Sequence, residues 1–468
     1  MKKIKNLTKI AAIFAIAFLA FSCSDDDDNS PEAALPETIT ELAVATPELS
    51  ILVDALTRAN LAETLNQPGE YTVFAPTNAA FTAFLDQNNI PSLNNVPVDV
   101  LTQILLNHVV LGENASTSLS TGYVSTLATQ PNSDLNLSMF IDTSNGVTLN
   151  GVSNVAIPDI NATNGIIHVV DNVIGLPTVV TQALANPAFS SLVAALSAAD
   201  GDLVSILNGE GTFTVLAPDN NAFTSFLNGT ALGDVPTDAL ANILLNHVLG
   251  SVVTSTDLVG LGAGYTNTLA TGPGVNNLSL YFNTTDGVSF NGISSVSAAD
   301  VVTTNGIIHA VDAVIGLPTI ATFATTNPAL GNLVSALQLA DTGSPTVDYI
   351  STVSDATAGP FTVFAPTNNA FAALLLELDP SGSTALADLN PATVDAVLLK
   401  HIVSGNIQSS GLPNGTVATL GGNITADNTA FTLTDPNNRV SNIITSLVDI
   451  QAINGVVHVI DKVILPAQ

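Results

Sequence analysis

The sequence predicts an α+β fold that occurs three times in tandem, and two observations carry this prediction. The first is a stretch from Asn164 to Ile174, opened by Asn-Gly and rich in β-branched residues, which recurs at 305–315 and 454–464. Its copies begin 141 and 149 residues apart, which is the size of a domain and far above the ~20–50 residue period of solenoid repeats. The second is the order within each unit, where helical apolar spacing comes first and β-rich sequence follows.

Leu-Pro pairs mark the boundaries between units. Leu176-Pro177, Leu317-Pro318 and Leu465-Pro466 each follow the repeated stretch within two residues, so one unit ends where the next begins. With so little linker, we expect successive domains to be held semi-rigidly. The predicted segments are a signal at 1–23, an acidic tether at 24–35, and domains at 36–176, 177–317 and 318–466.

The elements follow the same order in every unit. In the first unit, Leu49, Leu52 and Leu56 lie at helical spacing. The strand at 71–76 then runs into a turn at Thr77-Asn78, whose side chains can accept hydrogen bonds from the free N–H groups of the next helix.

A further helix and a β-rich region complete each unit. This helix follows a proline suited to a first turn, namely Pro97, Pro236 or Pro391. Asn150-Gly151 and similar pairs then signal hairpins. The repeated Asn-Gly stretch comes last and predicts a strand that is buried on both faces at the centre of the core.

Residues 1–23 predict a secretion signal. A Lys-rich start precedes an apolar run at 10–21, which is too short to span a bilayer. Cys23, the only cysteine, stands where this run stops. The site resembles a bacterial lipoprotein signal, in which the cysteine becomes the acylated first residue; small Ser22 fits, but Leu19 lies four residues before Cys23 and not the usual three. We therefore expect Cys23 to be lipidated and to anchor the chain in a membrane.

The acidic run from Asp25 to Asp28 follows at once. Like charges in a row cannot fold, so this run predicts a solvated tether. Acidic residues directly after a lipidated cysteine also resemble the surface-export signal of some Gram-negative lipoproteins. The expected location is the outer membrane at the cell surface, with its periplasmic face as the alternative.

Charge excludes one class of partner. The formal net charge is −31, all 39 acidic residues follow residue 23, and four of the eight basic residues precede it. Such a surface repels phosphate backbones, so we expect no nucleic-acid binding. The carboxylates could attract divalent cations diffusely, yet no Asp-x-Asp-x-Asp-Gly loop predicts a dedicated calcium site.

The six histidines fall at two positions per unit. Paired imidazoles are good zinc or copper ligands, but no cysteine or closely spaced carboxylate supplies a third ligand here. Core histidines that donate hydrogen bonds to backbone carbonyls explain the same pattern, so we expect no metal and no cofactor. The pairs are His108 and His168, His247 and His309, and His401 and His458.

Nothing in the sequence predicts an enzyme. Gly-x-Ser-x-Gly, His-Glu-x-x-His and a phosphate-binding glycine loop are all missing from the chain. Asp171, Asp312 and Asp461 lie three residues after the strand histidines, hence on the opposite strand face, so capping of the strand end is the expected role.

Three sequence blocks carry a family resemblance. The blocks at 72–81, 105–110 and 164–174 resemble, in this order, the signature blocks of the fasciclin-type domain, and all three blocks recur in each unit. The resemblance implies a wedge-shaped β-sandwich with several helices on one side. It also implies membership of a family of secreted or membrane-anchored adhesion proteins.

The resemblance also points to candidate binding residues. In animal members, integrin binding has been linked to a Tyr-His pair and to an Asp-Ile pair before the last block. Here the tyrosine is replaced by Asn107, Asn246 and Lys400, whereas an Asp–aliphatic pair is present in every unit. A structural role at the entrance of a strand is the alternative. The candidate pairs are Asp159-Ile160, Asp300-Val301 and Asp449-Ile450.

The function that these observations favour is adhesion without catalysis. A lipid-anchored surface protein with three similar domains could make many weak contacts with cell-surface or matrix proteins or with polysaccharide. The alternative is a periplasmic or surface protein that binds a small ligand or glycan for uptake. The alternative predicts an apolar pocket with converging polar groups in at least one domain, whereas adhesion predicts broad, shallow faces.

Overall fold

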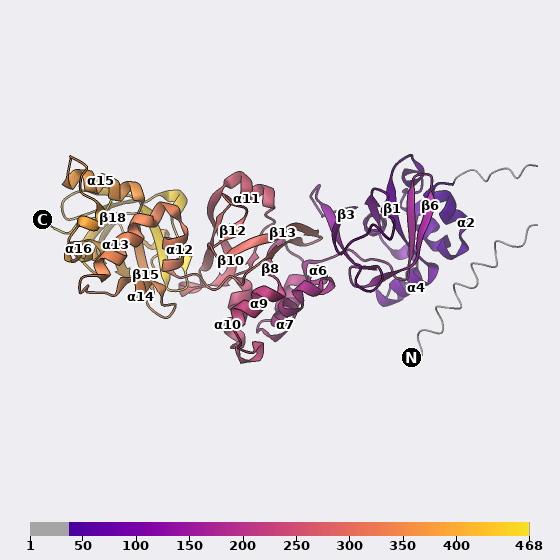
Figure 1. Cartoon of the computed structure of the whole chain (residues 1–468), viewed down its shortest axis with the longest axis horizontal. Coiled ribbons are helices and arrows are strands. Elements are labelled where there is room, and N and C mark those ends of the chain that lie inside the picture. The colour runs from indigo at the N-terminus through magenta and orange to yellow at the C-terminus, as the bar shows by residue number, and fades with distance from the viewer. Residues whose placement is uncertain (1–36, 468) are drawn as a thin grey trace, which may run out of the picture. The chain divides into compact units, whose positions relative to one another are not determined.

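The computed structural model describes residues 37–467 and shows one arrangement of helices and strands three times (Figure 1). Domain 1 contains helices α2 (Ile39–Ala45), α3 (Ser50–Arg58), α4 (Asn78–Gln87) and α5 (Val98–Leu106), and strands β1 (Tyr71–Pro76), β2 (Val109–Leu111), β3 (Gly122–Thr129), β4 (Asn136–Asp142), β5 (Thr148–Leu149), β6 (Ser153–Ala162) and β7 (Gly165–Val170). The helix N-termini are capped as the turn residues predict; for example, the Thr77 hydroxyl accepts from the Ala80 N–H.

Domains 2 and 3 repeat this order with local differences. Domain 2 contains α6 (Val179–Ala185), α7 (Ser190–Ala198), α8 (Leu203–Asn208), α9 (Asn220–Leu227), α10 (Thr237–Leu245) and α11 (Ser255–Leu261), with β8 (Phe213–Pro218), β9 (Val248–Leu249), β10 (Ala263–Thr271), β11 (Asn277–Asn283), β12 (Ser289–Phe290), β13 (Ser294–Thr303) and β14 (Gly306–Val311). Domain 3 contains α12 (Ile320–Thr326), α13 (Gly331–Asp341), α14 (Tyr349–Ser354), α15 (Asn368–Leu378) and α16 (Pro391–Leu399), with β15 (Phe361–Pro366), β16 (Ile402–Ser404), β17 (Gly415–Thr419), β18 (Gly422–Asp427), β19 (Thr432–Thr434), β20 (Val440–Asn442), β21 (Ile450–Ala452) and β22 (Gly455–Ile460).

The strands of each domain form two four-stranded sheets. In domain 3 the orders are β16-β15-β22-β21 and β17-β18-β19-β20. In domain 1 the corresponding sheets share the long strand β6, and a contact between β2 and β3 closes them into a barrel. Domain 2 has the same strand order, and its two sheets share β13. The predicted α+β fold in three tandem copies is confirmed, and in domain 1 the two sheets of the expected β-sandwich close into a barrel.

The repeated Asn-Gly stretch forms the central strand of each domain. All six residues of β7, β14 and β22 are buried. Strand β7 pairs in parallel with β1 and antiparallel with β6, and its counterparts pair in the same way. Neighbours on both edges and packing on both faces explain why this run is apolar apart from its histidine.

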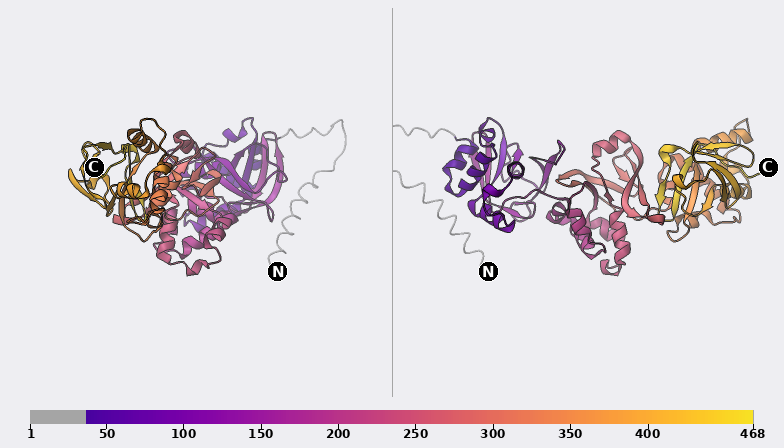
Figure 2. Two further views of the ribbon diagram at one scale, coloured as in Figure 1. Left: turned by 60° about the vertical axis from the view of Figure 1, so that its left-hand side comes forward. Right: turned by 180° about the vertical axis from the view of Figure 1, so that it is seen from behind.

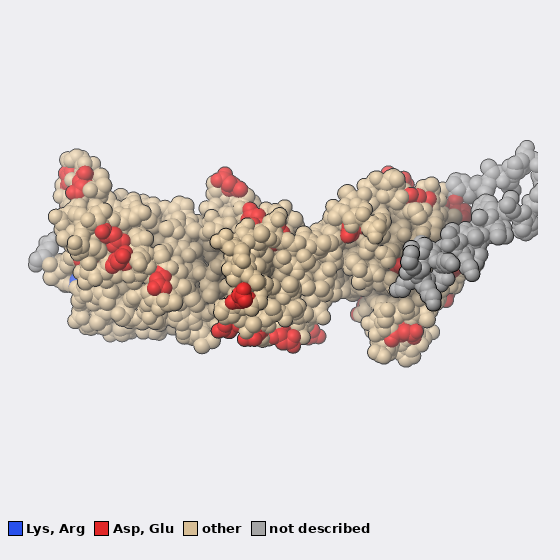
Figure 3. All heavy atoms as spheres, turned by 60° about the horizontal axis from the view of Figure 1, so that its bottom comes forward, with Lys and Arg blue, Asp and Glu red and all other residues tan. Residues whose placement is uncertain are grey.

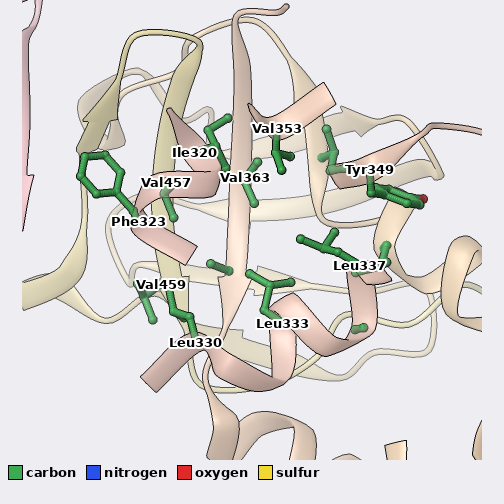
Figure 4. Close-up of a cluster of buried hydrophobic side chains, with 14 of the residues drawn as sticks. Ile320, Phe323, Leu330, Leu333, Leu337, Tyr349, Val353, Val363, Val457 and Val459 are labelled. Carbon is green, nitrogen blue, oxygen red and sulfur yellow. The ribbon is translucent and has the colours of Figure 1, made fainter. Parts of the chain in front are cut away.

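Helices cover one face of the sheet that contains the central strand. In domain 3, Leu333 and Leu337 of α13 point at Val363 and Val457 of neighbouring strands (Figure 4). Helices α7, α9 and α10 of domain 2 lie together on one side of its strands, whereas α11 lies on the other side (Figures 1 and 2). No single helix within residues 37–467 has the length and apolarity needed to cross a membrane.

Successive domains meet through the same contacts twice. The Ser138 hydroxyl of β4 accepts a hydrogen bond from the Val302 N–H of β13 at 2.9 Å. At the next boundary the Ser279 hydroxyl of β11 accepts from the Gln451 N–H of β21 at 3.0 Å. Leu137 of domain 1 and Val302 of domain 2 also belong to one buried apolar cluster. The domains are therefore in direct contact, as their short linkers predict.

A glutamine side chain sits at both boundaries but comes from different domains. Gln130 of domain 1 donates to the carbonyls of Thr303 and Gly306 of domain 2, at 2.8 and 2.9 Å. In domain 2, Gly272 stands at the position of Gln130. There, Gln451 of domain 3 donates to the two equivalent carbonyls of its own domain, at 2.8 and 2.9 Å. A Cβ at Gly272 would lie 3.0 Å from the Ala452 carbonyl oxygen and 3.5 Å from the Gln451 amide nitrogen, so a side chain at Gly272 would crowd the carbonyl that Gln451 binds.

We expect Gln130→Gly to destabilise the first boundary by about 2 kcal/mol, because the carbonyls of Thr303 and Gly306 each lose one buried hydrogen bond. Adding Val302→Gln recreates the second boundary and is expected to restore most of this free energy. Urea unfolding of the full chain, with hydrogen exchange around 303–306, measures both effects. A double variant no more stable than Gln130→Gly would show that the two arrangements are not equivalent.

The hairpin that reaches the next domain is shortened in domain 3. Residues 130–135 connect β3 to β4, and 272–276 connect β10 to β11. Only Leu420 and Gly421 connect β17 to β18. Within the described residues, domain 3 therefore has no counterpart of the hairpin tips through which domains 1 and 2 hold their neighbours.

Candidate functional site

The three Asp–aliphatic pairs lie on, or at the start of, the strand that neighbours the central strand. Asp159 and Asp300 sit where the pairing of β6 with β7, and of β13 with β14, shifts in register. Asp449 directly precedes β21. The predicted strand entrance is thus found in domain 3, but it is wrong for domains 1 and 2, where the aspartate lies in an irregularity inside a long strand. All three aspartates have left-handed backbones, with φ of 62°, 58° and 57°, which Asp tolerates better than most residues.

A serine holds each aspartate carboxylate. Asp159 accepts from the backbone N–H and the hydroxyl of Ser116 at 2.7 and 2.5 Å, and the hydroxyl bond is the main cause that lowers the pKa of Asp159. Asp300 accepts the same pair of bonds from Ser255. Asp449 accepts them from Ser409, at 2.6 and 2.5 Å. The aspartate side chains are 33–38% exposed, so the carboxylates remain accessible from one side.

The aliphatic members of the pairs point toward the cores. Val301 and Ile450 are each 2% exposed, and half-buried Ile160 packs against the core of domain 1. A partner could therefore reach the aspartates but not the aliphatic side chains of domains 2 and 3. In each domain, the Asp–aliphatic pair therefore forms a turn that is fixed by hydrogen bonds and leaves one carboxylate partly exposed.

The buried histidines of the central strands form hydrogen bonds that hold the same turn. In domain 1, the His168 Nε2–H donates to the Asn114 carbonyl at 2.9 Å, and its Nδ1 accepts from the Asp159 N–H at 3.2 Å. His309 and His458 make the equivalent bonds. Burial lowers the pKa of His309 and His458. A neutral imidazole with its proton on Nε2 satisfies all these bonds.

The other three histidines use the opposite tautomer. The His108 Nδ1–H donates to the Ile104 carbonyl at 2.7 Å, while Nε2 accepts from the Ile174 N–H at 2.9 Å. His108 lies two residues beyond the end of α5 rather than on its face, so it ties the end of the helix to the segment after β7. His247 and His401 repeat these bonds. Burial lowers the pKa of His108, His247 and His401 to about 4.

These lowered pKa values predict that acid destabilises every domain. The folded pKa of about 4 lies below the unfolded value of 6.5, so the unfolded chain takes up protons first as the pH falls. The stability that these neutral, buried histidines contribute is fully present above pH 6.5 and is lost progressively as the pH falls from 6.5 to 4. We expect each domain to lose about 2 kcal/mol at pH 5 relative to pH 7. Urea unfolding at both pH values measures this loss; equal stabilities would contradict it, and His108→Gln is expected to flatten the dependence in domain 1.

The described residues offer no centre for metal binding. Within residues 37–467, no three His, Cys, Asp or Glu side chains come close enough together to hold an ion. Asp171, Asp312 and Asp461 accept hydrogen bonds from backbone N–H groups across the sheet, at 2.7 Å in each domain, and so cap the end of the central strand. Cys23 and the acidic run Asp25–Asp28 lie outside the described residues.

On the face of the molecule shown in Figure 3, acidic side chains lie at several separate places. Only four basic residues follow residue 23, and one of them, Arg439, forms ion pairs with Glu377 and Asp435 at 2.6 and 3.7 Å. The acidic surface is therefore largely left without basic partners on the same chain.

Two features of the site were not predicted from the sequence. The first is the set of serines that hold the aspartates; each stands eight residues after the first histidine of its unit, which is a signal the sequence does contain. The second is a cavity of about 220 Å³ in domain 3, lined by α13, α15, α16 and residues 465–467. Its signal is Leu374, which occupies the position of Phe84 and Phe226 in the other domains.

Comparison with protein-family models agrees with three successive domains. The family model for the fasciclin domain matches residues 47–177, 187–318 and 330–466. An uncharacterised protein of Synechocystis is 43% identical over 137 residues, which cover 29% of this chain and 96% of that protein. A solved FAS1 domain pair from the insect cell adhesion molecule Fasciclin I has a TM-score of 0.36 and 21% identity, over 57% of this chain and 96% of that pair.

Animal proteins are also similar. The transforming growth factor-beta-induced protein ig-h3 of pig is 30% identical over 251 residues, which cover 52% of this chain and 34% of that protein. Human periostin is 27% identical over 429 residues, which cover 88% of this chain and 45% of periostin. The chain thus spans about a third of the length of ig-h3 and less than half that of periostin. Because the family model matches most of the chain in three successive segments, the protein belongs to the fasciclin domain family and contains three copies of the domain.

Proposed function

We propose that this protein is a lipid-anchored adhesion protein of the cell surface, which makes many weak contacts with cells, matrix or polysaccharide. Fasciclin domains are generally linked to cell adhesion and binding. The observation that carries the proposal is the repetition of one fasciclin domain three times, with direct contacts that recur at both boundaries. Three similar faces on one chain, and many chains on one cell, can act together.

Multivalency is the proposed mechanism. Once one domain is bound, the others of the same chain face the partner at high effective concentration, so weak single contacts add up to strong attachment. Fixed boundaries favour this effect because less freedom is lost when a second domain binds. The candidate contacts include the partly exposed carboxylates of Asp159, Asp300 and Asp449. Divalent cations could bridge these and other surface carboxylates to an acidic partner.

The proposed anchor is the acyl chain on Cys23, and the proposed location is the outer surface of the outer membrane. Two signals support this assignment: the apolar run that stops at Cys23 and the acidic residues that follow it. The acidic run would also keep the domains away from the membrane, because like charges extend a chain.

Attachment of intact cells tests the proposal. Wild-type cells, a deletion strain and a Cys23→Ala strain are compared for attachment to surfaces and to each other, with protease accessibility measured in parallel. We expect the protein of wild-type cells to be cleaved by external protease, and both altered strains to attach poorly. Unchanged attachment in the deletion strain, or a protein protected from protease until the outer membrane is opened, would contradict the proposal.

A second candidate function is a surface or periplasmic protein that binds a small ligand. The cavity of domain 3 favours it, although the converging polar groups expected of such a site are largely missing, since Thr393 is the one polar residue in its lining. Catalysis has no comparable support, because the histidines and aspartates that repeat in each domain are engaged in fixed hydrogen bonds with backbone and serine groups.

A further inference from the structure

The cavity of domain 3 is large and almost wholly apolar. It measures about 220 Å³, more than the ~150 Å³ engineered protein cavity that stays dry and takes up benzene. Of its fourteen lining residues, thirteen are apolar, and the exception, Thr393, is itself exposed. An apolar lining offers water almost no hydrogen-bond partners, so the cavity favours a hydrocarbon ligand.

Helix α15 supplies one wall. Phe371, Leu374, Leu375 and Leu378 stand at positions i, i+3, i+4 and i+7 of this helix and all line the cavity. Helix α15 has 11 residues, against 10 in α4 and 8 in α9. The last turn adds Leu378, which is 57% exposed and gives the cavity an apolar rim.

The chain contains its own comparison for the origin of the cavity. At the position of Leu374, domain 1 has Phe84 and domain 2 has Phe226, and both phenylalanines pack against the apolar cores of their domains. Because a phenylalanine is larger than a leucine, Leu374 fills less space than the phenylalanines of domains 1 and 2. The fold therefore tolerates a phenylalanine at this position.

Polar contacts fix the opposite wall. The Leu465 N–H donates to the Asp435 carboxylate at 3.1 Å, and Arg439 donates to the Val463 carbonyl at 3.0 Å. Arg439 also bonds Glu377 of α15 at 2.6 Å and so links the two walls. Because the walls are tied together, a ligand would enter a site that is already formed.

We propose that domain 3 binds a free, uncharged amphiphile whose unbranched alkyl chain fills this cavity. The lining is aliphatic apart from Phe371, and no charged group lines it, so the buried part of the ligand must be hydrocarbon. The polar end must stay at the mouth, next to Thr393 and Leu378. The net negative charge of the chain disfavours an anionic head group there. This site goes beyond adhesion, and its failure would leave the adhesion proposal untouched.

A series of unbranched alcohols from hexanol to dodecanol tests the site. The probes are titrated by calorimetry into the full chain carrying Cys23→Ala, so that no acyl group of its own competes. We expect one site per chain, with affinity rising about fourfold for each added methylene until the cavity is full. The carboxylate of equal chain length is expected to bind at least tenfold more weakly.

Two substitutions in α15 locate the site. Leu374→Phe introduces the residue of domains 1 and 2 and is expected to lower alcohol affinity at least tenfold while the melting temperature is kept. Leu376→Phe, on the same helix but 56% exposed and outside the lining, is expected to leave affinity unchanged. Val397→Phe on the facing helix serves as a second filling variant if Leu374→Phe does not fold.

Three results would overturn the proposal: no binding of any alcohol up to its solubility, equal affinity in the filled and control variants, or binding to phosphatidylcholine vesicles without binding of the free alcohols. The last result would assign the cavity to a membrane lipid instead.

Discussion

Gly165→Ala is expected to unfold domain 1 or to cost it at least about 3 kcal/mol of stability. Gly165 begins the central strand β7 and pairs with Tyr71 of β1. A Cβ at Gly165 would lie 2.0 Å from the Tyr71 carbonyl oxygen, and φ is +150°, which L-residues rarely adopt. The clash is with backbone, so no side chain can move to relieve it. Hydrogen exchange of the segment 165–174 in the full chain measures the effect.

The control for this prediction lies in the same domain. Gly122 has a nearly identical φ of +155°, but a Cβ there would meet no atom within 4 Å. Gly122→Ala therefore carries the backbone strain without the collision, and we expect it to cost about 1 kcal/mol. Equal losses in the two variants would mean that backbone conformation, and not the close approach of β1 and β7, explains the glycine.

Asn164→Asp is expected to destabilise domain 1 by about 3 kcal/mol or more. The Asn164 amide is buried, and its nitrogen donates to the carbonyls of Leu65 and Gln67 at 2.8 and 3.0 Å, while its oxygen accepts from the Ile39 N–H at 2.9 Å. Aspartate has nearly the same shape but offers two acceptors, so both carbonyls lose their donor and face a buried charge. Urea unfolding of the full chain at pH 7 measures the loss.

A second Asn-Gly pair provides the matched control. Asn145 precedes Gly146 as Asn164 precedes Gly165, but Asn145 is exposed. We expect Asn145→Asp to change the free energy of unfolding by less than about 0.5 kcal/mol. Asn305 and Asn454 make the same three bonds in domains 2 and 3, so the equivalent substitutions should weaken those domains. Similar small losses at Asn164 and Asn145 would refute the role of the buried amide as the link between helices and sheet.

The parts of the fold that depend on local pattern could be predicted from the sequence. The β-branched run after Asn164 indicates a central strand because a strand with neighbours on both edges and packing on both faces is mostly apolar. Thr77 predicts the start of α4 because a hydroxyl can cap a free helix N–H. Pro391 lies in the first turn of α16 as expected, whereas Pro97 and Pro236 stand one residue before their helices.

Features that depend on distant contacts could not be predicted in this way. The Asp159 N–H meets His168 because β6 and β7 fold back on each other with a shifted register, which residue spacing alone does not reveal. The bond from Gln130 to Thr303 spans 173 residues and two domains. At the cavity of domain 3, leucine replaces the phenylalanine of domains 1 and 2, and periodicity treats this change as neutral because both residues are apolar.

The central claim is that attachment comes from many weak contacts, and the dependence of attachment on surface density tests it most directly. The full chain is expressed in the deletion strain from an inducible promoter, chains per cell are counted with labelled antibody, and the retention of cells under flow is recorded. Weak contacts acting together predict little retention at low density and a steep rise above a threshold. Retention that rises in proportion to density from the lowest level would indicate a single strong contact per chain, and retention that does not change with density would contradict adhesion altogether.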